Sequence, residues 1–162
     1  MTPQIAAIHL ALVAVPVFVA LWTDLSAMRI PNAISLAMLA IFVVAAPLTL
    51  PLADIPWRLA TAGIVFAICL LLYILRQMGA GDVKFAGAIF LFVEPADVTF
   101  FIRILAIMAL AGVITHRLFA RIPAARAMAP HWTSWTAEGV FSYGVALSLA
   151  LVYYLLLVAL GG

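Results

Sequence analysis

Long apolar stretches recur along this chain and leave few folds open to it. Six stand out, at residues 5–22, 33–50, 58–75, 83–93, 100–119 and 140–160, and a helix needs about 20 apolar residues to cross a bilayer core. Only 9% of the residues are charged, against about 25% in a typical soluble domain. The sequence therefore predicts an all-α, polytopic membrane helical bundle with about six transmembrane helices, formed by residues 1–162 as a single membrane-embedded domain.

The composition argues against several kinds of site. The single cysteine, Cys69, rules out an internal disulfide and a cysteine-cluster zinc site. His116 and His131 lack the spacing of metal ligands, so neither a metal nor another cofactor is expected. No basic patch suggests nucleic acid as a partner, whereas membrane lipids are expected to surround the chain. His9 lies within the first apolar stretch and is expected to be packed or to face the interface.

The basic residues predict the orientation in the membrane. Six spans place both termini on one side. The connections one–two, three–four and five–six then contain or flank Arg29, Arg76, Lys84, Arg117, Arg121 and Arg126. The other side holds only Arg58 and Arg103, which are expected to extend along the outer face. Positive residues concentrate on the cytoplasmic side, so both termini should be extracytoplasmic.

The fourth apolar stretch is too short for a simple crossing. Residues 83–93 form eleven positions, or about 17 Å of helix, against a bilayer core of about 30 Å. One explanation is that the segment 79–82 (GAGD) dips into the membrane zone and lines a wet cavity, where irregular backbone is tolerated. The other is that the helix continues past Glu94, whose side chain reaches the interface.

Two aspartates border apolar stretches on the predicted cytoplasmic side. Asp24 follows the first stretch and Asp82 opens the fourth. Two carboxylates that face each other share one proton, so that one acts as a base on water while the other polarises a carbonyl. The structural alternative is that Asp82 is only a helix N-cap and Asp24 only a solvated residue at a helix end. Glu138 is expected to be an acid at a helix start.

The segments DL at 24–25, RIPN at 29–32 and GAGDVKF at 79–85 form a recognisable set. Together they resemble the type IV prepilin peptidase family, membrane aspartic proteases of the GxGD class. The resemblance implies that Asp24 and Asp82 are the catalytic residues. It also marks residues for substrate binding or support of the site, namely Gly79, Gly81, Lys84, Arg29 and Asn32. The segment FSYGVA at 141–146 is similar to the start of the family's last span.

The resemblance covers most of the chain and is closest to the minimal members that serve tight-adherence (Flp) pilus systems. Larger members carry a further cytoplasmic domain linked with N-methylation of the product. The implied function is an inner-membrane aspartic endopeptidase that cleaves the leader from prepilins or pseudopilins at the cytoplasmic membrane face. The rival interpretations are a small proton-coupled transporter and a non-catalytic scaffold for pilus assembly. The oligomeric state stays open.

Overall fold

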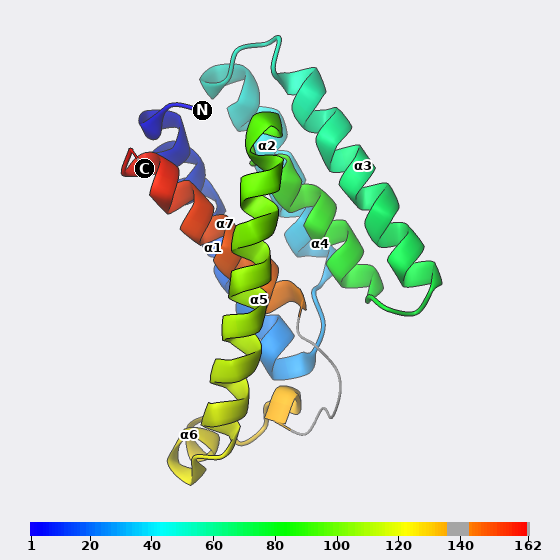
Figure 1. The fold of residues 1–162 in the computed structure, drawn as a ribbon, viewed down its shortest axis with the longest axis vertical. Coiled ribbons are helices and arrows are strands. Elements are labelled where there is room, and N and C mark those ends of the chain that lie inside the picture. The colour runs from blue at the N-terminus through cyan, green and yellow to red at the C-terminus, as the bar shows by residue number, and fades with distance from the viewer. Residues whose placement is uncertain (136–142, 162) are drawn as a thin grey trace.

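The computed structural model describes residues 1–135 and 143–161, and its regular elements are all helices (Figure 1). In chain order they are α1 (Pro3–Ala27), α2 (Asn32–Thr49), α3 (Ile55–Ile74), α4 (Ala80–Phe90), the short 3-10 helix η1 (Pro95–Asp97), α5 (Val98–Ala120), α6 (Pro123–Met128), the 3-10 helix η2 (Thr133–Trp135) and α7 (Tyr143–Ala159). Glu138, Phe141 and Ser142 lie outside the described residues.

Within the described residues, 1–135 and 143–161, four helical stretches are long and apolar enough to cross a membrane. They are α1, α2, α3 and the continuous stretch Pro95–Ala120, which combines η1 and α5, and α7 is a shorter apolar helix of 17 residues. Much of their apolar surface faces outward: among its 20 residues α3 buries only Arg58 and Ala62. Such exposure suits a lipid-facing surface. The predicted helical membrane bundle is confirmed, and the protein is a multi-pass membrane protein.

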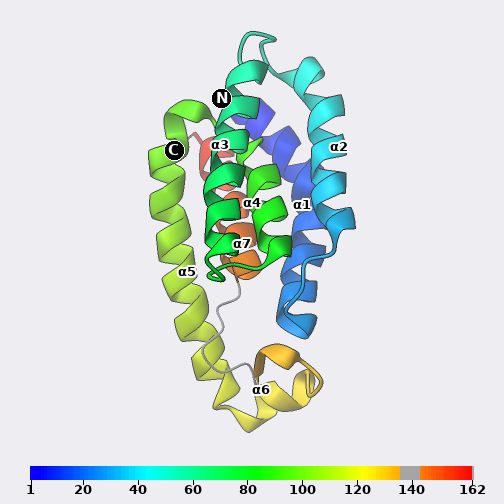
Figure 2. The ribbon, with the colours of Figure 1, turned by 90° about the vertical axis from the view of Figure 1, so that its right-hand side faces the viewer.

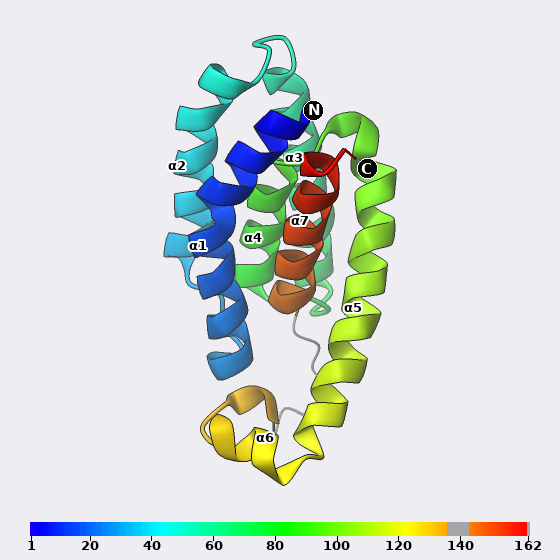
Figure 3. The same ribbon diagram turned by 90° about the vertical axis from the view of Figure 1, so that its left-hand side faces the viewer.

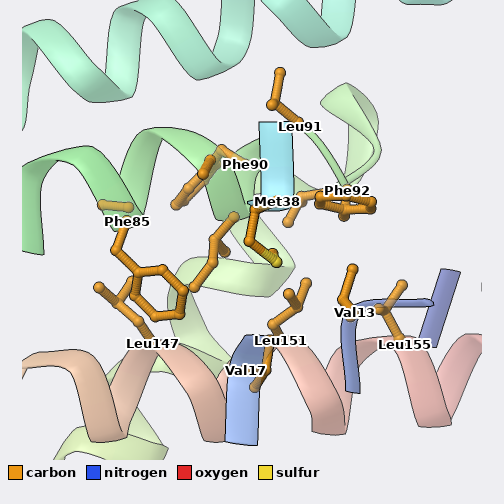
Figure 4. Packing of buried hydrophobic residues seen from close by; sticks show 14 of the residues in the cluster. Val13, Val17, Met38, Phe85, Phe90, Leu91, Phe92, Leu147, Leu151 and Leu155 are labelled. Carbon is orange, nitrogen blue, oxygen red and sulfur yellow. The ribbon is translucent and has the colours of Figure 1, made fainter. Parts of the chain in front are cut away.

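The short helix α4 occupies the centre of the bundle. It packs against α2, α3 and α7, while α7 also packs against α1 and α5 (Figures 2 and 3). Seven of its eleven residues are buried, all from Val83 onward, whereas Lys84 near its start is exposed. Labelled side chains of α1, α2, α4 and α7 meet in this layer (Figure 4). Small residues allow close contact, because a Cβ on Gly87 would lie 3.2 Å from Phe66 of α3.

Helix α4 ends at Phe90, so the alternative that it continues past Glu94 is wrong. Glu94 adopts extended backbone (φ −62°, ψ 131°) directly before Pro95, because a proline disfavours helical backbone in the residue that precedes it. Buried residues Leu91 to Val93 fill the path between α4 and the next helix. The alternative, that segment 79–82 lies within the membrane zone, stays a prediction.

A cluster of polar groups, formed by Met1, Arg58 and Glu94, lies at the end of the bundle where the two termini are (Figure 1). Arg58 is fully buried and its Nη2 lies 2.9 Å from Oε2 of Glu94, which also pairs with the amino group of Met1 at 2.7 Å. The expectation that Arg58 extends along the outer face is therefore wrong: the packing of α3 on α4 brings it to a carboxylate instead. His9 is packed as expected, with Nε2 3.0 Å from Oγ1 of Thr49.

This ion pair yields a stability prediction. Glu94→Leu removes the carboxylate and leaves the Arg58 guanidinium buried without its partner, which costs about 3–5 kcal/mol when one member of a buried pair is lost. We expect a clear drop in the thermal unfolding midpoint of the purified protein in detergent. The double variant Arg58→Met/Glu94→Leu should recover much of the loss, and Asp54→Asn should be neutral. An unchanged midpoint in Glu94→Leu would show that the pair does not stabilise the fold.

Candidate functional site

Asp24 lies inside α1 and not after it. The helix continues five residues beyond the predicted end at residue 22, to Ala27. It stops at Met28, which adopts left-handed backbone (φ 50°, ψ 40°) and donates its N–H to the carbonyl oxygen of Asp24 at 3.0 Å. The Asp24 side chain is only 4% exposed. The alternative that it is a solvated residue at a helix end is therefore wrong.

The start of α7 meets the Asp24 carboxylate. The backbone N–H of Val145 donates a hydrogen bond to Oδ2 of Asp24 at 3.1 Å, although the two residues lie 121 positions apart in the sequence. The first amides of a helix have no carbonyl partner within the helix and carry a partial positive charge. A carboxylate is therefore a suitable partner for this end of α7. Sequence reasoning missed the contact because a backbone donor leaves no mark in the residue types.

Asp82 is the third residue of α4, and the N-cap of that helix is Gly79. The interpretation of Asp82 as the N-cap is therefore wrong. Its carboxylate folds back toward the cap and accepts a hydrogen bond from the Gly79 backbone N–H, as the acidic residue of a capping box does. Asp82 is half-buried. Gly81, the residue before it, lies against Ile30, and Ile30 and the Asp24 carboxylate both lie against Gly144.

The start of α4, which carries Asp82, packs against the loop that follows α1, the helix that carries Asp24. A Cβ on Gly81 would lie 2.8 Å from the carbonyl oxygen of Ile30, so this position needs glycine for the close approach. Nζ of Lys84 donates to Oδ1 of Asn32 at 2.9 Å and forms a second link. The junction of α2 and α4 thus brings together four of the residues that the sequence marks: Gly79, Gly81, Lys84 and Asn32.

Arg29 differs from those four. It is exposed, and within residues 1–135 and 143–161 its side chain forms no hydrogen bond or ion pair. An open pocket of about 420 Å³ lies at the end of α3 and the start of its connection to α4, and is lined by Tyr73, Ile74, Arg76 and Met78.

Aromatic contacts tie the segment after α5 to the end of α1. Trp22 meets Trp132 edge-on with ring centroids 5.4 Å apart, Trp132 stacks on Trp135 at 5.6 Å, and Trp135 stacks on His116 at 4.8 Å. The segment that carries α6 and η2 lies beyond the end of α1 (Figure 3). The aspartate end of the bundle is thus bordered by an aromatic ladder that spans from α1 to α5.

The chemistry available at this end is that of two neighbouring carboxylates. One is nearly buried and the other half-buried, and such a pair can divide the roles of base and acid between its members. Among residues 1–135 and 143–161, no group of three or more His, Cys, Asp or Glu side chains is arranged to hold a metal ion.

Comparison with known proteins gives one match. A model of the type IV leader peptidase family matches residues 11–116, a range that includes both Asp24 and Asp82 but ends before α7. The comparisons with curated proteins and with solved structures each returned no match. The family match spans well over half of the chain. The chain therefore belongs to the type IV leader peptidase family.

Proposed function

We propose that this protein is a membrane aspartic endopeptidase that removes the leader from type IV or Flp prepilins or pseudopilins, with Asp24 and Asp82 as its catalytic pair. Membership of the leader peptidase family implies peptidase activity on prepilin-type substrates. The observation that carries the finer proposal is the placement of two carboxylates from separate segments at one end of the bundle. Asp24 lies near the end of α1 and Asp82 near the start of α4. Ile30 links them, because it contacts Gly81 beside Asp82 and lies next to Gly144 with the Asp24 carboxylate.

The proposed reaction needs one water and one proton shared by the pair. One carboxylate takes a proton from water as the water oxygen attacks the scissile carbonyl carbon, while the protonated carboxyl donates a hydrogen bond to the carbonyl oxygen. The tetrahedral intermediate then collapses: the C–N bond breaks, the leaving nitrogen gains a proton, and the new carboxyl group departs. The pair is left again with one shared proton.

The surroundings of Asp82 suit an extended substrate. A peptide carbonyl inside a helix already accepts a hydrogen bond, so the substrate must unwind at the cut. Gly79 and Ala80 are exposed beside Asp82, which leaves room for such a segment. A family substrate with a basic leader and an apolar helix would be cut at the membrane boundary, after a small residue.

The distribution of charge supports an orientation for the enzyme. Arg29 and Lys84 lie at the aspartate end of the bundle, and Arg58 lies with Glu94 at the end that holds the termini. Arg76, Arg121 and Arg126 also lie in the connections at the aspartate end, and Arg117 lies in the last turn of α5. The positive-inside rule therefore directs this end to the cytoplasm. We propose that the protein resides in the bacterial inner membrane, with both termini extracytoplasmic.

The dyad is tested by conservative replacement. Asp24→Asn keeps an acceptor for the Val145 N–H, and Asp82→Asn keeps one for Gly79, but neither can exchange a proton. Each should reduce cleavage of a prepilin peptide by at least about 100-fold with an unfolding midpoint close to that of the wild type. Asp54→Asn, far from the site, is the control and should cleave normally. Full cleavage by either variant would refute the dyad. Cleavage by the purified wild type separates a peptidase from the transporter and scaffold interpretations, neither of which predicts it.

The orientation is tested by reporter fusions. A fusion after Gly162 should report the extracytoplasmic side, and a fusion near Arg126 should report the cytoplasm. Both follow from the excess of basic residues at the aspartate end. The reverse pattern would place Asp24 and Asp82 on the wrong side for a leader peptidase.

The junction of α2 and α4 yields a third expectation. Gly81→Val places a branched side chain against the Ile30 carbonyl, which a Cβ would approach to 2.8 Å, and should displace Asp82 relative to Asp24. Ala80→Val adds bulk at an exposed neighbouring position. We expect the first variant to lose roughly ten times more activity than the second, because small displacements of catalytic groups are costly. Equal activities would show that the close approach does not matter.

A further inference from the structure

We propose that Gly144 and the backbone N–H of Val145, at the start of α7, form a seat that positions the Asp24 carboxylate beside Asp82. The inference rests on the proposed function, because it assigns Gly144 as a positioning residue for the same reaction. The seat lies beyond residue 116, where the family match ends. It would make the last helix part of the active site.

The first observation is steric. A Cβ on Gly144 would lie 2.6 Å from Oδ2 and 2.9 Å from Cγ of Asp24, and 2.6 Å from Cδ1 of Ile30. Real Cβ atoms do not approach other heavy atoms so closely, so even alanine must push something aside. Gly144 is itself buried. The absence of a side chain is therefore what lets the carboxylate lie against the backbone of α7.

The second observation is the hydrogen bond that fixes the carboxylate there. Oδ2, the oxygen that lies closest to Gly144, is also the one that accepts the Val145 N–H at 3.1 Å. Close packing and a directed donor thus act on the same atom. Helix α7 packs against α1, so the helix that supplies the donor is in contact with the helix that carries Asp24.

Among the glycines of residues 1–135 and 143–161, Gly144 is the one whose Cβ would meet a carboxylate of another helix; a Cβ on Gly79 would meet Oδ2 of Asp82, three residues along the same segment. A Cβ on Gly112 of α5 would make only ordinary contact with Cγ1 of Val145, at 3.9 Å. A Cβ on Gly87 of α4 would crowd the Phe66 ring at 3.2 Å, a contact between apolar groups. These two positions supply matched controls, one for an added methyl group beside Val145 and one for a packing defect remote from Asp24.

The test measures steady-state cleavage of a prepilin peptide by the purified full chain in detergent. Gly144→Ala should lower kcat about 100-fold, because displacement of a catalytic group by about 1 Å has an effect of that order, while KM changes little. Gly112→Ala should leave kcat and KM unchanged. Gly87→Ala should lower the thermal unfolding midpoint but retain the kcat of the folded protein. A wild-type kcat in Gly144→Ala, or a rise in KM alone, would overturn the proposal.

A second variant separates the two clashes at Gly144. In Gly144→Ala/Ile30→Val the Cδ1 atom that opposes the new methyl group is gone, and only the clash with Asp24 remains. We expect the unfolding midpoint to recover while kcat stays low relative to Ile30→Val alone. Recovery of kcat would show that Gly144 acts through packing against Ile30, and would overturn the proposal. If Gly144→Ala alone does not fold, the same comparison is made in the Ile30→Val background.

The outcome is distinguishable from failure of the proposed function. If Asp24→Asn and Asp82→Asn are inactive but Gly144→Ala cleaves normally, the catalytic pair stands and the seat is wrong. If either Asn variant cleaves normally, the pair itself is wrong whatever Gly144→Ala does.

Discussion

A buried carboxylate joins the first and last helices of this protein. Asp24 of α1 is 4% exposed and accepts the N–H of Val145 at the start of α7. Burial of a charged group is costly unless hydrogen-bond donors surround it, so the position of α7 and the position of this side chain depend on each other. The same contact holds one carboxylate at the end of the bundle where α4 presents the other, Asp82.

The central helix explains how the second carboxylate reaches that point. In a membrane, a helix satisfies its own backbone, and irregular backbone is tolerated only where protein or water surrounds it. Helix α4 is short and buried, and its first turn meets the α1–α2 loop through Gly81 and Lys84. Gly81 permits the close approach of α4 to Ile30 because it has no side chain. The hydrogen bond from Lys84 to Asn32 forms a second link between α4 and α2. The Asp82 carboxylate therefore lies beside two exposed residues, Gly79 and Ala80.

The sequence predicted the helices well because apolar length and turn residues are local signals. The end of α1 was placed too early, since the left-handed Met28 that ends the helix is not a residue type that marks such a position. The burial of Arg58 was missed because its partner, Glu94, lies 36 residues away. The motifs point to Asp24 and Asp82 as candidates for the catalytic pair, but no residue type points to the Val145 amide. The sequence signal for this contact is the segment 141–146, which includes Gly144 and is similar to the start of the family's last span.

The most direct measurement is the identity of the products that the purified wild-type protein makes from a prepilin peptide. Mass spectrometry should find two fragments whose masses sum to that of the peptide plus one water. The second fragment should begin at the boundary between the basic leader and the apolar helix. An intact peptide after incubation with folded protein, or cuts scattered away from that boundary, would contradict the account of this chain as a leader peptidase that uses Asp24 and Asp82.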